Sequence, residues 1–96
     1  MPPPKCDVLL HSNIIIIPDN KVMQKYEEMY HKIISANIKK LRKNSKLSQE
    51  EFAEKINCSR EFVSRVENLR EKISLKMLLK LSEFFKVSPK YFFEEN

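Results

Sequence analysis

Four residues near the middle of the chain have side chains that can bind the exposed edges of DNA bases. Arg60 and Arg65 carry guanidinium groups that can each donate two parallel hydrogen bonds to guanine. The carboxylate of Glu61 can accept a hydrogen bond from cytosine, and the hydroxyl of Ser64 can bond to several bases. A helix over residues 60–68 would carry all four into the major groove of DNA, so this helix is predicted to contact bases.

The residues that come before this segment predict a short helix beginning at Gln49. The Ser48 hydroxyl can cap this helix, and Glu51, three residues further on, completes a capping box. One face of the helix is apolar and consists of Phe52, Ala53 and Ile56. The helix should end at Asn57, because asparagine tolerates the left-handed conformation that often follows a helix.

A second short helix follows, with Ser59 as its N-cap residue. Val63 and Val66 form its apolar face, so the four candidate base contacts point elsewhere. The small side chain of Ala53 would let the two helices cross closely at a steep angle. A helix-turn-helix has this arrangement, and its second helix enters the major groove.

From Ile38 to Phe93 the chain resembles the phage-repressor-like (Cro/repressor, XRE-type) helix-turn-helix family of DNA-binding proteins. The matching features are the Ser48 to Glu51 opening, Ala53, Ser59, the Val63 and Val66 pair, Glu67, Asn68 and the upstream Arg42. The chain departs from the family at Asn57 and Leu69, which replace glycines, and at Ile73, where proline is frequent. Asparagine is a mild change, but Leu69 could send the loop to Ile73 along a different path.

The resemblance implies an all-α fold of five helices and assigns roles to further residues. The residues expected to contact DNA phosphates are Gln49, Ser59 and Asn68, with Arg70 and Lys72 adding charge contacts. Arg42 and Glu67 are expected to form an internal ion pair. A homodimer would place its two recognition helices about 34 Å apart, which is one turn of DNA.

The same apolar positions would also suit a helical hairpin in any small bundle, but the caps, the turn and Ala53 together favour the helix-turn-helix. Cys58 is expected to be a small buried side chain, and only Cys6 could pair with it. Without a Cys/His cluster we expect no metal and no cofactor. We expect no enzymatic activity either, because no nucleophile and base pair can be assembled and no glycine is present for a phosphate-binding loop.

The chain has 96 residues and a net charge of +5, and the excess positive charge lies in one part of it. Residues 1–37 contain four lysines and four acidic residues, whereas residues 38–96 contain fourteen lysines and arginines against nine glutamates. A basic surface suits phosphate binding, although charged helices also serve solubility alone. No apolar segment is long enough to span a membrane, and the first residues lack the features of a signal peptide, so we expect a cytoplasmic protein.

Residues 1–34 are predicted to be an N-terminal extension, and residues 35–96 the DNA-binding domain. In the extension, Ile14, Ile15, Ile16 and Ile17 predict a short strand. This strand could pair with Val8–Leu10 of its own chain or with the same strand of a second subunit, and we favour pairing between subunits. An apolar stripe then predicts a helix from Asn20 to about Lys43, with a break near Ser35 as an alternative.

Two further helices are predicted after the recognition helix. Ser74 should cap the first of them, and its core residues are expected to be Leu75, Leu78, Leu79, Leu81 and Phe84 or Phe85. Pro89 should begin the second, which contains the aromatic cluster Tyr91, Phe92 and Phe93. This cluster is a second candidate for the dimer contact, although some of its rings should be in the core.

These features predict a sequence-specific regulator of transcription that binds double-stranded DNA, acting as a repressor and a homodimer. The alternative is an antitoxin or anti-regulator, a protein-interaction module whose N-terminal extension binds another protein.

Overall fold

The computed structural model describes residues 20–96, which form helices and connecting turns. These are α2 (Asn20–Asn44), α3 (Gln49–Lys55), α4 (Arg60–Glu67), α5 (Leu75–Phe85) and the 3-10 helix η1 (Pro89–Phe93). The last helix begins at Pro89, as predicted, and it is a 3-10 helix, so the all-α fold of five helices is found only in part. Residues 20–96 contain no strand and no helix that is long and apolar enough to cross a membrane. The strand predicted at Ile14–Ile17 lies outside the described residues.

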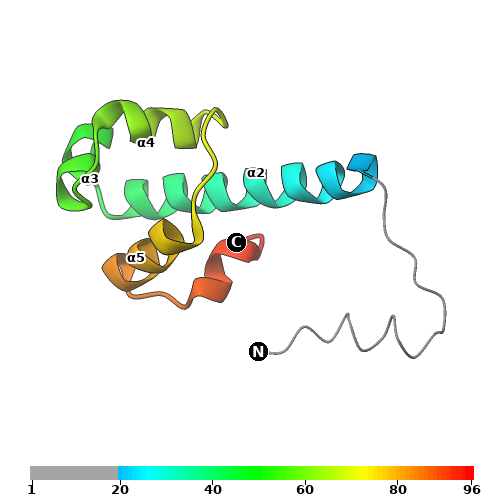
Figure 1. Cartoon of the computed structure of the whole chain (residues 1–96). Coiled ribbons are helices and arrows are strands. Elements are labelled where there is room, and N and C mark those ends of the chain that lie inside the picture. Colours follow the sequence, from blue (N-terminus) through cyan, green and yellow to red (C-terminus); the bar gives the residue numbers. More distant parts are fainter. Residues whose placement is uncertain (1–19) are drawn as a thin grey trace.

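The helices lie on two sides of α2. Figure 1 shows α4 on one side of the C-terminal half of α2, and α5 and η1 on the other. α3 packs against α4, and η1 packs against both α2 and α5. The buried apolar side chains of this core are Ile38, Phe52, Ala53, Ile56, Val63, Val66, Leu78, Leu81 and Phe92. The Phe52 ring lies 6.0 Å from that of Phe84 and 5.5 Å from that of Phe85, so α3 and α5 close the end of the core together.

α2 is one continuous helix of 25 residues, and the alternative break near Ser35 is not present. Ser35 is instead buried in the middle of the helix. The C-terminal half of α2 packs into the core, whereas Val22, Tyr26 and Met29 in its N-terminal half are exposed. A boundary after residue 34 therefore falls inside a helix, and the division into an extension and a domain stays a prediction.

Two leucines of α5 are not in the core, contrary to expectation. Leu75 is 70% exposed and Leu79 is 48% exposed, whereas Leu78 and Leu81 are buried. Leucines recur in α5 at spacings of both three and four residues. The sequence therefore predicted a wider apolar face than α2, α3 and η1 cover.

η1 is fixed to α2 by the side chain of Asn37. This side-chain amide is buried in α2 and donates to the carbonyl oxygens of Tyr91, Phe92 and Glu94 at 3.2, 3.0 and 2.8 Å. Buried polar groups require such partners, so these contacts both satisfy Asn37 and hold the C-terminal segment on the core.

Each α-helix is followed, within two residues of its end, by a residue with positive φ, although the chain contains no glycine. These residues are Lys46, Asn57, Leu69 and Lys86, with φ of 59°, 58°, 64° and 56°. The left-handed conformation lets backbone N–H groups beyond the helix bond to its last carbonyl oxygens, which would otherwise lack partners. At the end of α4, for example, the Arg70 N–H donates to the Arg65 carbonyl at 2.8 Å.

Candidate nucleic-acid interface

Reciprocal hydrogen bonds fix the start of α3. The Ser48 hydroxyl accepts from the Glu51 N–H at 3.0 Å, and the Glu51 carboxylate accepts from the Ser48 N–H at 2.8 Å. The prediction that α3 begins at Gln49 with a capping box is therefore confirmed. The backbone N–H of Ser48, and to a smaller extent its hydroxyl, lower the pKa of Glu51 below its ordinary value, because a hydrogen bond donated to the carboxylate favours its charged form.

The turn between α3 and α4 follows from Asn57 and Ser59. α3 ends at Lys55, and Asn57 then takes the left-handed conformation expected of it, which brings the Cys58 N–H within 2.8 Å of the Ala53 carbonyl. Ala53 is buried where the two helices cross. The Ser59 hydroxyl accepts from the Phe62 N–H at 3.0 Å, so α4 begins at Arg60.

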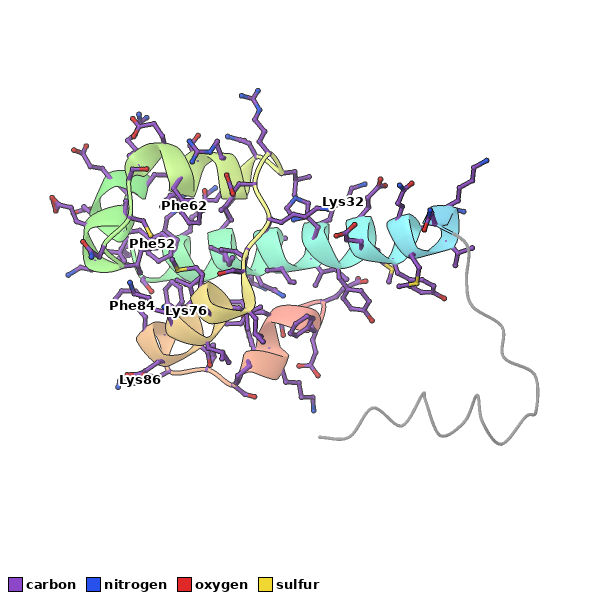
Figure 2. The ribbon with its side chains drawn as sticks, in the orientation of Figure 1. Lys32, Phe52, Phe62, Lys76, Phe84 and Lys86 are labelled. Carbon is purple, nitrogen blue, oxygen red and sulfur yellow. The ribbon has the colours of Figure 1, made fainter. Side chains whose placement is uncertain are left out.

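α4 has a buried face and an outward face. Val63 and Val66 are buried, and Phe62 packs partly buried against the core, on the inner side of α4 in Figure 2. Arg60, Glu61 and Arg65 are exposed and Ser64 is half-buried. The four candidate base contacts therefore lie on α4 away from the apolar residues that hold this helix against the core.

The four candidates differ in what holds them. The Arg65 Nε donates to Glu71 Oε1 at 3.2 Å, and the Ser64 hydroxyl accepts from Asn68 Nδ2, also at 3.2 Å. Within residues 20–96, the side chains of Arg60 and Glu61 make no hydrogen bond or ion pair. Hydrogen bonds to Glu71 and Asn68 thus hold the candidates in the C-terminal half of α4. The two candidates in its first turn have no such bonds within residues 20–96.

The five candidate phosphate contacts are placed in different ways. Ser59 and Asn68 lie at the two ends of α4 as its cap residues. The Gln49 amide donates to Glu67 Oε1 at 3.1 Å, and Lys72 Nζ lies 2.9 Å from Glu27 Oε2 of α2. Arg70 is exposed, and its guanidinium has no partner among the described residues.

Arg42 and Glu67 form an ion pair between α2 and α4. Arg42 Nε and Nη2 donate to the two carboxylate oxygens of Glu67 at 2.7 and 3.0 Å, and Nη1 donates to the Leu47 carbonyl at 2.7 Å. The Glu67 side chain is only 1% exposed, so the pair is sheltered from water. It connects the recognition helix to α2 and, through Gln49, to α3.

Sequence reasoning missed Glu71 and Lys80. Glu71 lies beyond the end of α4, where helical periodicity gives no information about its neighbours. Lys80 Nζ donates to the Ile56 carbonyl at 2.6 Å, across 24 positions of sequence, and so caps α3 from α5. No local motif predicts such a contact, because the tertiary fold alone brings the two residues together.

The part of the chain that the structure describes contains no group of three or more His, Cys, Asp or Glu side chains placed to bind a metal. Cys58 is half-buried, with its thiol 3.6 Å from the Ile56 carbonyl oxygen. Cys6 lies outside the described residues.

Comparison with known proteins agrees with this geometry. A family model described as helix-turn-helix matches residues 38–92, which is more than half of the chain. The chain therefore belongs to this helix-turn-helix family, as its sequence predicted, and double-stranded DNA is the partner that the family binds.

A solved structure is also similar to this chain. The crystal structure titled hypothetical transcription factor NHTF from Neisseria is similar, with a TM-score of 0.65 and 26% sequence identity. The match covers 83% of this chain and 84% of that chain, so it extends well beyond the two short helices. No curated protein sequence gives a significant match.

Proposed function

We propose that this protein is a sequence-specific transcriptional repressor that binds double-stranded DNA as a homodimer. The observation that supports this most is the outward placement of Arg60, Glu61, Ser64 and Arg65 on a helix whose other face is buried. These side chains have the hydrogen-bonding groups that read bases in the major groove. The description of the Neisseria neighbour as a hypothetical transcription factor supports a regulatory role.

The charge distribution supports the same proposal. Residues 38–96 carry fourteen lysines and arginines against nine glutamates, so the DNA-binding half is basic. Cationic side chains displace counterions from DNA phosphates, and this supplies much of the affinity of such proteins. Gln49, Ser59, Asn68, Arg70 and Lys72 are the proposed phosphate contacts. On binding DNA, Gln49 and Lys72 would either replace their bonds to Glu67 and Glu27 by bonds to phosphate oxygens or bond to both at once.

Exposed apolar side chains support a homodimer. Phe93 is exposed and packs edge-on against Tyr30, with 6.1 Å between ring centroids. Tyr26 and Met29 lie nearby on α2 and are also exposed. Phe92, by contrast, is completely buried in the core, so only Tyr91 and Phe93 of the aromatic cluster have surface to offer a second subunit.

A protein-interaction module, such as an antitoxin or anti-regulator, is the second candidate function. An open groove beside α2 favours it, because Met23, Tyr26, Tyr30, Ile34 and Ile73 give the groove an apolar lining. The groove shares Lys72 with the proposed phosphate contacts but includes none of the four candidate base contacts of α4. For either role we propose a cytoplasmic, non-enzymatic protein without a cofactor.

Selection from a library of random DNA duplexes tests the proposed function. The full-length protein should enrich a sequence with two half-sites about one helical turn apart. Arg65→Ala should weaken binding to that sequence by about 1–3 kcal/mol and leave binding to random DNA nearly unchanged, because base contacts carry the discrimination. A protein that enriches no sequence contradicts the proposal. A reporter with the selected site at its promoter then tests repression. We predict a lower transcript level when the protein is present than when it is absent.

A further inference from the structure

Arg65 is held by a residue outside the recognition helix. Its Nε lies 3.2 Å from Glu71 Oε1, and the two side chains are 47% and 40% exposed. Within residues 20–96, Nη1 and Nη2 of Arg65 have no partner. One edge of the guanidinium is therefore occupied and the other is open.

The turn that follows α4 brings Glu71 to this position. Leu69 has φ of 64°, its N–H donates to the Val66 carbonyl, and the Arg70 N–H donates to the Arg65 carbonyl at 2.8 Å. These bonds close the end of the helix and reverse the chain. Glu71 then lies beside the same residue, Arg65, whose carbonyl anchors the turn.

The geometry of the guanidinium gives this contact a consequence for DNA. Guanine offers two acceptors, O6 and N7, and arginine can bond to both from two of its nitrogens. When Glu71 accepts from Nε, the remaining pair is Nη1 and Nη2, which form a planar fork. A side chain already held in one orientation also loses less conformational freedom when it binds.

We propose that Glu71 is a specificity-determining residue that acts through Arg65. It orients the Arg65 guanidinium so that Nη1 and Nη2 bond to one guanine, and it does not contact DNA itself. This proposal rests on the proposed function, because it requires α4 to lie in the major groove. Arg60 provides a contrast on the same helix, since no carboxylate of residues 20–96 holds its guanidinium.

Two effects of Glu71 on binding have opposite signs, which makes them separable. Its negative charge repels phosphates, so its removal should strengthen binding to all DNA sequences alike. Its hydrogen bond orients Arg65, so its removal should weaken discrimination at a single base pair. The ratio of two affinities cancels the first effect and retains the second.

The experiment measures binding of the full-length protein to two duplexes by fluorescence anisotropy. One duplex carries the selected site, and the other has a single G·C to A·T change at the base pair where Arg65→Ala loses discrimination. Glu71→Ala should lower the affinity ratio of the two duplexes about 1.5- to 5-fold, in the range of exposed ion pairs. Glu71→Gln, which keeps an acceptor oxygen of similar position, should lower the ratio less.

Two controls separate the orientation of Arg65 by Glu71 from a general effect of removing a negative charge. Glu54→Ala removes the same charge from an exposed residue of α3 whose side chain makes no hydrogen bond in the described structure, and it should leave the ratio unchanged. In an Arg65→Ala background, Glu71→Ala should have no further effect on the ratio, because the residue through which it acts is absent. Circular dichroism of each variant checks that the helices are retained.

Two results would overturn the proposal. An unchanged ratio in a folded Glu71→Ala protein would show that Glu71 does not orient Arg65. An equal loss in the Arg65→Ala background would show that Glu71 acts by another route. Neither result affects the proposed function, which fails if the unmodified protein selects no DNA sequence.

Discussion

Glu67 is the residue on which three helices of the DNA-binding unit converge. Arg42 from α2 and Gln49 from α3 both donate hydrogen bonds to its carboxylate, which belongs to α4. Taking this carboxylate out of water is costly, and the bonds from Arg42 and Gln49 offset that cost. The contact therefore fixes the direction of the recognition helix relative to the other two helices.

The removal of one member of this pair should be strongly destabilising. Arg42→Ala leaves the Glu67 carboxylate buried without its cation, so we predict a loss of about 3–5 kcal/mol in the free energy of unfolding. Urea unfolding followed by circular dichroism measures this loss. Arg65→Ala is the control, because its exposed pair with Glu71 should contribute about 1 kcal/mol at most. Equal losses for the two variants would contradict the importance given to burial.

At this scale the sequence predicts contacts that are local. The Ser48 and Ser59 caps were correctly predicted because both the donor and the acceptor lie within three residues. The contact of Glu71 with Arg65 and that of Lys80 with Ile56 were not predicted. Glu71 reaches Arg65 through the turn after α4, and Lys80 reaches Ile56 only when α5 packs beside α3. Helical periodicity holds no pattern for either contact.

The ends of the α-helices show what a chain without glycine does where glycine is usual. Asn57 was expected in the left-handed conformation, because asparagine adopts it more readily than other residues with a side chain. Lys46, Leu69 and Lys86 carry no such signal and adopt it nonetheless. Leu69 thus takes a φ that is usual for glycine, and the different path considered for the loop from Leu69 to Ile73 stays a prediction.

Glycine at one of these positions should stabilise the protein. Lys86→Gly removes the steric cost of a Cβ in the left-handed region, so we predict a gain of about 1 kcal/mol in the free energy of unfolding. Lys39→Gly is the matched control, because Lys39 is exposed in the interior of α2, where glycine should cost about 1 kcal/mol. Changes of the same sign in thermal or urea unfolding would argue against strain at Lys86.

α2 shows how far periodicity can predict an element. Its spacing correctly predicted one helix from Asn20 to about Lys43, and the helix ends at Asn44. The spacing also defines an apolar face, but it does not tell what covers that face. In the structure, η1 and the core cover the C-terminal half, while Tyr26 and Met29 stay exposed.

The run of four isoleucines leads to a prediction about the whole molecule. Ile14–Ile17, which lie outside the described residues, would each gain about 1.5–3 kcal/mol from full burial in a dimer contact. Removal of residues 1–18 should therefore leave a helical protein but shift it toward monomer, and it should weaken binding to a site with two half-sites. Sedimentation equilibrium measures the shift. An unchanged dimer affinity would move the contact to Tyr91 and Phe93, with Phe93→Ser as the variant that tests it.

The uneven charge of the chain belongs to this scale as well. All of the net charge of +5 arises from residues 38–96, the part that contains α3 and α4. A surface that neutralises phosphates releases condensed counterions, so its affinity for DNA must fall as salt rises. This dependence distinguishes a DNA-binding surface from helices that are charged only for solubility.

A salt titration of duplex binding tests the account most directly. We predict that the logarithm of the binding constant falls linearly with the logarithm of salt concentration, with a slope of about −0.9 for each phosphate contact. Arg70→Ala and Lys72→Ala should each make that slope shallower by about 1. A flat titration, or no complex with duplex DNA even at low salt, would contradict DNA binding by α4 and the basic residues around it.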